Sequence, residues 1–160
     1  MEKNKWNVYL SGEIHSNWRE EINEGIALQK LPITTLSPVT IHSDSDNCGA
    51  EILGQEDNAF WHDYKGASIN FIRNNKLIKQ ADIVIVRFGE KYRQWNAAFD
   101  AGIAVTMKKP IITLHEPSLN HALKEIDSAS SAVCYDTGQV ILILSYLVNG
   151  KLNPLEKNTR

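Results

Sequence analysis

Several features that would assign this sequence to a class of protein are missing from it. Its 160 residues include only two cysteines, Cys48 and Cys134, and neither belongs to a Cys-x-x-Cys pair. We therefore expect free thiols, not a disulfide framework or a zinc site. The longest apolar stretch, from Val140 to Val148, is too short to span a bilayer. The first residues lead directly into a strand-like run without the apolar core of a signal peptide. These absences predict a cytoplasmic protein with no membrane partner.

An excess of positive charge is also absent. The chain has 17 Lys and Arg residues against 19 Asp and Glu residues, for a formal net charge of -2. Proteins that bind nucleic acids usually carry a basic surface, so we expect no nucleic-acid polymer as a partner. A small anionic ligand stays possible, because it needs only a local positive spot. The sequence contains no G-x-G-x-x-G, Walker or G-x-S-x-G motif.

What the sequence does contain is an alternation of apolar runs with helical patterns. Ile83 to Val86, four consecutive aliphatic residues, are typical of a buried parallel strand. Strands are expected at 6–10, 33–40, 81–86, 110–114 and 132–135, and helices at 17–30, 67–80, 94–108, 118–126 and 138–148. This pattern predicts one α/β domain over residues 1–150, followed by a loose tail over 151–160. The domain should be doubly wound and flavodoxin-like, with a five-stranded parallel sheet of order 2-1-3-4-5 and helices on both faces.

Two local features need separate interpretation. Asn17, with Glu20 three residues later, predicts a capping box at the first helix. Residues 41–66 are polar and acidic and are expected to form a long loop, with the aromatic residues at its end making an ordered lid or wall. The same segment holds side chains that could bind a metal ion: His42, Asp44, Asp46, His62 and Asp63. Their spacing matches no dense metal-binding motif, so no metal or cofactor is expected.

In a sheet of this order, ligands bind at the carboxyl ends of strands one and three. Residues 9–16 form the first segment that reaches this edge. Gly12 lets the backbone turn, and the helix start beyond it offers free N–H groups near Ser16 and Arg19. Such a turn can hold a phosphate or a carboxylate, although an ordinary strand-to-helix connection has the same appearance.

Two further segments reach the same edge. Residues 87–96 combine three cations with three aromatic residues, so Arg87 or Arg93 could pair with an anion and Trp95 could stack on a base. A solvated loop is the alternative. Asp100 lies in an alanine-rich helix, where a carboxylate should be either poised for function or paired in an internal salt bridge.

Three stretches together resemble the nucleoside 2-deoxyribosyltransferase superfamily, and in detail its YtoQ family. They are Tyr9-Leu10-Ser11-Gly12, Asn74 to Val86, and Phe99-Asp100-Ala101-Gly102-Ile103-Ala104, and the resemblance covers residues 6 to 148. The most specific motifs are Ala-Asp-Ile-Val-Ile-Val at 81–86 and carboxylate-x-Gly-x-Ala at 100–104. Their order and spacing carry the resemblance.

The resemblance implies an enzyme that cleaves or transfers an N-glycosidic bond through a carboxylate nucleophile. The nucleophile would be Asp100, and Tyr9 would orient it. Asn74 replaces an aspartate that handles the proton of the base, and an amide cannot act as an acid. The resemblance also implies a homo-oligomer. The residues expected to bind the nucleoside or nucleotide are Ser11, Gly12, Ser16, Arg19, Asn74, Arg87, Gln94, Trp95 and Asn96.

Two other functions remain open at this point. One is a non-catalytic module that binds a nucleoside or nucleotide. The other is an enzyme that acts on a nucleoside 5′-monophosphate, with Arg19 and Ser16 on the phosphate. A Tyr9 hydroxyl directed at an unpaired Asp100 in a cleft would favour an enzyme, whereas an Asp100 locked to an arginine would favour binding or a structural role.

Overall fold

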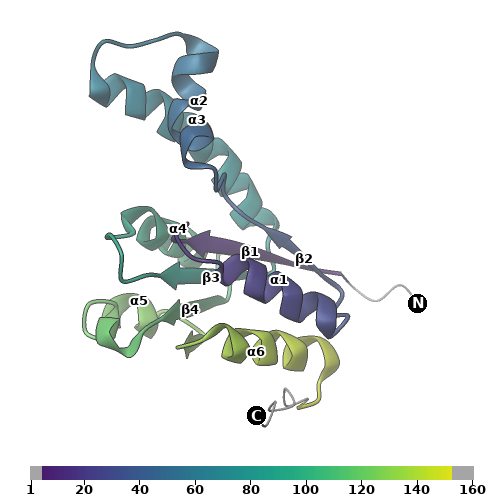
Figure 1. The fold of residues 1–160 in the computed structure, drawn as a ribbon. Helices are drawn as coiled ribbons and strands as arrows, with labels where there is room; N and C mark the ends of the chain where they lie inside the picture. Colours follow the sequence, from purple (N-terminus) through teal and green to yellow (C-terminus); the bar gives the residue numbers. More distant parts are fainter. Residues whose placement is uncertain (1–4, 153–160) are drawn as a thin grey trace.

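The computed structural model describes residues 5–152, which form a parallel sheet with helices on both sides (Figure 1). The five strands lie in the order β2-β1-β3-β4-β5, and every neighbouring pair is parallel, so the predicted fold class is confirmed. The strands are β1 (Trp6–Gly12), β2 (Ile33–Leu36), β3 (Ile83–Phe88), β4 (Ile111–His115) and β5 (Ala132–Cys134). The helices are α1 (Trp18–Leu28), α2 (His42–Leu53), α3 (Ala59–Gln80), α4 (Trp95–Thr106), α5 (Lys124–Ser128) and α6 (Thr137–Asn149), with a 3-10 turn η1 (Pro117–Leu119).

The two faces of the sheet bury different side chains of the same strands. In β1, Val8 and Leu10 pack in the core that includes α1 and α6, whereas Tyr9 packs in the core that includes α3 and α4. This follows from the two-residue period of a strand. Because β3 is buried on both faces, its sequence reads as a continuous aliphatic run. The side that holds Tyr9 is the side on which the candidate site lies.

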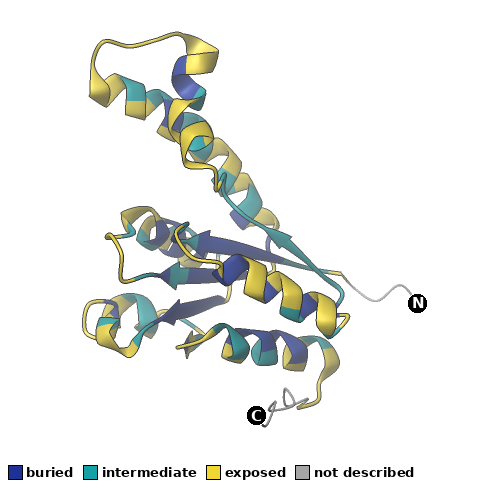
Figure 2. Cartoon of the chain, viewed as in Figure 1, coloured by how far each residue is buried: buried dark blue, intermediate teal, exposed yellow. Residues whose placement is uncertain are grey.

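Residues 41–66 do not form the expected long loop. They form α2 and the first turns of α3, which starts at Ala59 and not at 67. The two helices make a hairpin that projects from the sheet, and most of its surface is exposed (Figures 1 and 2). The sequence of α2 lacks the periodic apolar residues that would have indicated a helix, because this helix buries only Gly49 and Ala50. The close approach depends on glycine: a Cβ atom at Gly49 would lie 2.4 Å from the backbone nitrogen of Gly66.

Other expected boundaries also change. Strand β2 ends at Leu36, not at 40, and Pro38 beyond it has no N–H group for pairing. The predicted capping box is wrong, because the Asn17 side chain makes no capping hydrogen bond. The helix expected over 118–126 is divided into η1 and the short helix α5.

The C-terminal helix α6 packs inside the domain. Its residues Val140 and Leu144 contribute to the core that β1 and α1 also form. The loose tail expected over 151–160 has its last eight positions, 153–160, outside the described residues. Within residues 5–152, no helix is both long enough and apolar enough to cross a membrane.

Candidate active site

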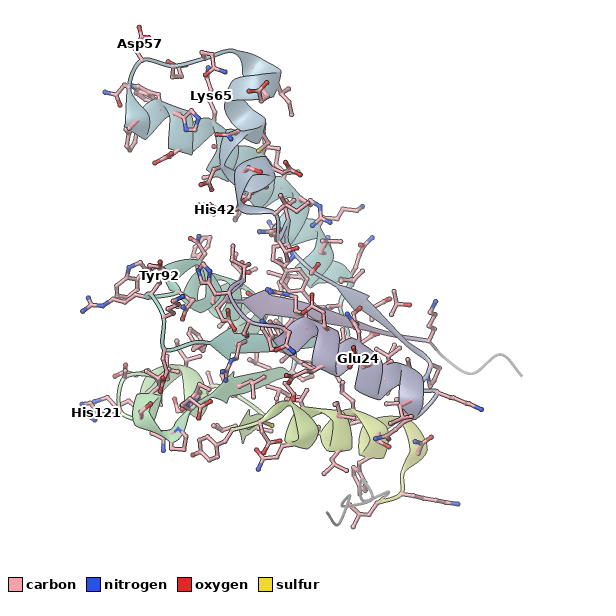
Figure 3. The ribbon with its side chains drawn as sticks, viewed as in Figure 1. Glu24, His42, Asp57, Lys65, Tyr92 and His121 are labelled. Carbon is pink, nitrogen blue, oxygen red and sulfur yellow. The ribbon has the colours of Figure 1, made fainter. Side chains whose placement is uncertain are left out.

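A cleft of about 900 Å³ opens at the carboxyl ends of β1 and β3. Its walls come from the β1–α1 turn, the base of the α2–α3 hairpin, the β3–α4 loop and the start of α4. His42 at the start of α2 and Tyr92 in the β3–α4 loop both line it, and Figure 3 labels these two residues. Ligand pockets typically measure about 300–1,000 Å³, so the cleft can accommodate a nucleoside.

Asp100 is buried at the inner wall of this cleft, with 8% of its surface exposed. The small residues Ala97, Ala101 and Ala104 pack in the same core as Tyr9, and this close packing brings α4 up to the sheet. The hydroxyl of Ser11 donates a hydrogen bond of 2.6 Å to the Asp100 carboxylate. No lysine or arginine among residues 5–152 forms an ion pair with Asp100, so the carboxylate is not locked in a salt bridge.

Burial raises the pKa of Asp100 above its usual value, although hydrogen bonding to Ser11 and Tyr9 acts in the opposite direction. Tyr9 is fully buried on β1, and its own pKa is raised by burial and by the nearby Asp100 charge, so the phenol stays neutral. The Tyr9 hydroxyl and Asp100 are therefore close neighbours. Among residues 5–152, the buried Tyr9 hydroxyl has no hydrogen-bond partner of standard geometry.

Gly12 allows the backbone to leave β1 beside this pair. Its φ angle is +131°, in the range that side chains rarely adopt, and a Cβ atom there would lie 2.2 Å from the carbonyl oxygen of Arg87. The next residue, Glu13, donates its N–H to that same carbonyl at 3.2 Å. The glycine thus holds the β1–α1 turn against the end of β3.

Arg19 holds the turn from the inside and does not face the cleft. Its guanidinium donates to the carbonyl oxygens of Leu10, Gly12 and Glu13, at 3.2, 3.0 and 2.7 Å. The residue is buried, and the cleft lining does not include it. The expected anion contact through Arg19 would require these bonds to break.

The turn contains a buried carboxylate, Glu13, that sequence reasoning missed. One Glu13 oxygen accepts hydrogen bonds from the N–H groups of His15 (2.6 Å) and Ser16 (3.1 Å), and the Ser16 hydroxyl donates to the other oxygen. Ser16 is therefore bound to Glu13 in this structure. An acidic residue in the turn between β1 and α1 was the available signal, because free N–H groups in such a turn attract negative charge.

Two other expected ligands stabilise the loops around the cleft. Arg87 lies between two carboxylates, with its Nε 4.0 Å from Glu13 and an Nη 3.6 Å from Glu116, and it does not line the cleft. Gln94 accepts from the N–H of Gly89 and donates to two carbonyl oxygens of the β3–α4 loop. Its amide therefore fixes the shape of that loop.

The remaining expected residues line the cleft, as Gln94 also does. Asn74 on α3 presents an amide oxygen that is buried and has no hydrogen-bond partner among the described residues. Trp95 and Asn96 line the cleft at the start of α4, and the Trp95 ring is 70% exposed. Tyr64 from the hairpin also lines it. No group of three His, Cys, Asp or Glu residues within 5–152 is arranged to hold a metal ion.

Comparison with known proteins agrees with this architecture. Residues 9–148 match the family described as nucleoside 2-deoxyribosyltransferase YtoQ. A relative from Bacillus subtilis (strain 168), the uncharacterized protein YtoQ, is 49% identical over 140 residues, which cover 88% of this chain and 95% of the relative.

Two solved structures have a similar fold. One is the 2-deoxyribosyltransferase from Bacillus psychrosaccharolyticus, with a TM-score of 0.55 and 18% identity, covering 84% of this chain and 90% of that one. The other is a conserved protein from Enterococcus faecalis V583, with a TM-score of 0.59 and 12% identity, covering 89% and 99%. The extent of the family match and the identity to the Bacillus subtilis relative show that this chain belongs to the nucleoside 2-deoxyribosyltransferase YtoQ family.

Proposed function

We propose that this protein cleaves or transfers the N-glycosidic bond of a nucleoside, with Asp100 as the nucleophile. The observation that carries the proposal is the Asp100 carboxylate itself. It is buried and hydrogen-bonded to Ser11, has no ion-pair partner among the described residues, and lines a cleft large enough for a nucleoside. Burying a carboxylate without a counter-ion is costly, and functional sites are where proteins commonly accept that cost.

The chemistry proceeds in two displacements at the anomeric carbon. An Asp100 oxygen forms a bond to this carbon while the carbon–nitrogen bond breaks, and the base leaves with the electron pair and takes a proton from water. Water, or the nitrogen of a second base, then attacks the same carbon, and the ester bond to Asp100 breaks. The attacking group releases one proton, which replaces the proton taken by the leaving base. Two displacements retain the configuration of the sugar.

Ser11 and Tyr9 are positioning residues in this proposal. The Ser11 hydroxyl directs one carboxylate oxygen, which leaves the other to face the cleft. The neutral Tyr9 phenol lies beside the carboxylate and can donate to it when a substrate tightens the site. Because α4 and β1 carry these groups, their geometry depends on the core beneath and not on a flexible loop.

Asn74 and Trp95 are the proposed contacts to the base. The unpartnered amide oxygen of Asn74 can accept an N–H group of a base, and a ligand that supplies this donor removes the cost of a buried unsatisfied acceptor. The exposed Trp95 ring, which also lines the cleft, offers a flat apolar surface on which a base can stack. Asn96 lines the same cleft and adds a second amide to it.

A second candidate function is binding of a nucleoside without cleavage. It is favoured by Asn74, because an amide cannot donate a proton to the leaving base as an acid would. Hydrolysis with water as the proton source is compatible with the same residue. The two candidates differ in whether the base is released.

The deciding experiment measures base release by chromatography from a panel of ribonucleosides and 2′-deoxynucleosides. Asp100→Asn keeps the size of the side chain and an acceptor for Ser11, but it removes the nucleophile. Asp57→Asn is the matched control, because Asp57 is exposed at the far end of the hairpin (Figure 3). We expect release by the wild type and by Asp57→Asn, and at least a thousandfold loss in Asp100→Asn, as losses of essential catalytic groups reach that order. Saturable binding without release would support the binding module, and release by Asp100→Asn would exclude Asp100 as the nucleophile.

We also propose that the protein forms a homo-oligomer through the α2–α3 hairpin. Phe60, Trp61 and Tyr64 form an aromatic cluster near the start of α3, with Trp61 edge-to-face against the other two rings, and all three are exposed. A contiguous aromatic patch of this kind marks an interaction surface. Light scattering should show a smaller particle for the double variant Phe60→Ser/Trp61→Ser than for the wild type or for Tyr146→Ser, the control on α6. A wild-type monomer would refute the proposal.

A further inference from the structure

The β1–α1 turn has the components of an anion-binding site, and the chain itself occupies it. In doubly wound folds, this turn and the helix start after it commonly hold phosphate groups. Here the two N–H groups of His15 and Ser16 and the Ser16 hydroxyl all donate to the Glu13 carboxylate. Glu13 is 7% exposed, and its side chain lies against Gly89, where a Cβ atom would be 3.0 Å from the Glu13 Cγ.

The two arginines near this turn, Arg19 and Arg87, also already have partners within the chain. The Arg19 guanidinium donates to three backbone carbonyls, and Arg87 lies between Glu13 and Glu116. Burial acts to raise the pKa of Glu13, but hydrogen bonds from Ser16 and His15 together with Arg87 outweigh it and hold the pKa below its usual value. Glu13 is therefore a carboxylate at neutral pH, and a phosphate would have to displace it.

The position of Glu13 relative to Asp100 links it to one part of the substrate. Ser11 holds Asp100, and Glu13 lies two residues further along the chain, on the same wall of the cleft. The turn begins directly after Ser11, so it borders the part of the cleft in which a substrate attacked by Asp100 would lie. A 5′-phosphate on a substrate attacked by Asp100 would thus reach the turn that Glu13 fills.

We infer that Glu13 is a specificity-determining residue that excludes a 5′-phosphate, so that the site accepts nucleosides and rejects nucleoside 5′-monophosphates. This inference rests on the proposed function. Charge in the cleft acts in the same direction: the described residues that line it include four carboxylates, Glu13, Asp46, Asp63 and Asp100, and one arginine, Arg93. A phosphate dianion placed among these groups meets repulsion from several sides.

The experiment compares kcat/KM for 2′-deoxyadenosine and 2′-deoxycytidine with kcat/KM for their 5′-monophosphates. It uses the wild type, Glu13→Ala, Glu13→Gln and the matched control Glu24→Ala, which removes an exposed glutamate from α1 (Figure 3). We expect the wild type and Glu24→Ala to favour the nucleosides by at least tenfold. Glu13→Ala should reduce this preference by tenfold or more, because it frees the two N–H groups and the Ser16 hydroxyl. Glu13→Gln, which removes the charge but fills the turn, should lie between them.

A wild type that prefers the monophosphates, or a preference that neither Glu13 variant changes, would overturn the inference. If Glu13→Ala does not fold, Glu13→Gln and the wild-type preference decide it. If no substrate releases its base, the proposed function fails, and thermal shifts with inorganic phosphate decide the role of Glu13 separately. Stabilisation of Glu13→Ala by phosphate, without stabilisation of the wild type, would support the role, and equal shifts in both proteins would overturn it.

Discussion

Replacing Gly12 with alanine should destabilise the protein through two separable effects, and two other glycines isolate them. Gly102, in the exposed part of α4, has no atom within 4 Å of the position that a Cβ atom would take, and its φ angle is not positive. Gly54 has a φ of +101° but equally open surroundings. Gly12 combines a φ of +131° with a Cβ position 2.2 Å from the Arg87 carbonyl oxygen. Gly102→Ala therefore introduces no strain, Gly54→Ala introduces backbone strain alone, and Gly12→Ala introduces both backbone strain and a steric clash.

The expected magnitudes follow from these geometries. Gly102→Ala should raise the free energy of unfolding by about 0.5–1 kcal/mol, because alanine has the higher helix propensity. Gly54→Ala should lower it by about 1–3 kcal/mol through the unfavourable φ. Gly12→Ala should cost a similar backbone strain and, in addition, about 1–3 kcal/mol for overpacking against Arg87. Its free energy of unfolding should therefore fall by about 2–6 kcal/mol in total. For a chain of this size, that loss corresponds to a fall in Tm of roughly 4–24 °C.

Urea unfolding followed by tryptophan fluorescence measures these differences, since the buried Trp18 packs in the core beside β1. Gly12→Ala should also reduce base release in the folded protein, because the clash displaces the end of β3 or the residues that follow Ser11. A Gly12→Ala variant that is no less stable than Gly54→Ala would refute the reasoning. It would mean that the Arg87 backbone moves away from the new methyl group at little cost.

Buried groups elsewhere give three further expected results. Asp100→Asn should abolish base release yet raise the free energy of unfolding at pH 7 by about 0.5–2 kcal/mol. The native pKa of Asp100 is raised by burial, so its ionisation costs stability as the pH rises, and the advantage of the variant should vanish below about pH 4. Ser11→Ala removes a hydrogen bond that lowers the pKa of Asp100, so the acid limb of the pH–activity profile should move to higher pH. Burial raises the pKa of Cys134 to about 11, so a disulfide reagent at pH 8 should modify Cys48 first and Cys134 only as the protein unfolds.

Each of these expectations has a contrary outcome. Lower stability of Asp100→Asn at pH 7, measured by urea unfolding, would show that the ionised carboxylate stabilises the fold. An unchanged acid limb in Ser11→Ala would mean that a group other than Asp100 sets it. Equal labelling rates for the two thiols, followed by mass spectrometry, would show that Cys134 is accessible in the native protein.

Much of the fold could be predicted because the relevant patterns are local. The aliphatic run of β3 indicated a strand buried on both faces, and the alternation of strands and helices indicated the sheet order that the structure shows. The projecting hairpin could not be predicted in the same way. Its helices are exposed on most sides, and their mutual contact depends on Gly49 and Gly66, which leave no apolar period in the sequence.

The candidate site, like the fold, could be predicted from the sequence only in part. Local sequence was sufficient to expect Ser11 and Asp100 at one edge, because the carboxyl ends of parallel strands and the elements after them share that edge, whereas Asn74 was expected there only from the family resemblance. It could not show that Arg19 is bound to carbonyls, that Arg87 lies between two carboxylates, or that Gln94 fixes a loop. Sequence position determines which groups come near the cleft. The hydrogen-bond partners of those groups decide which of them are free to bind a ligand, and several of those partners are distant in sequence, as in the Ser11–Asp100 pair separated by 89 positions. Only the tertiary structure places them.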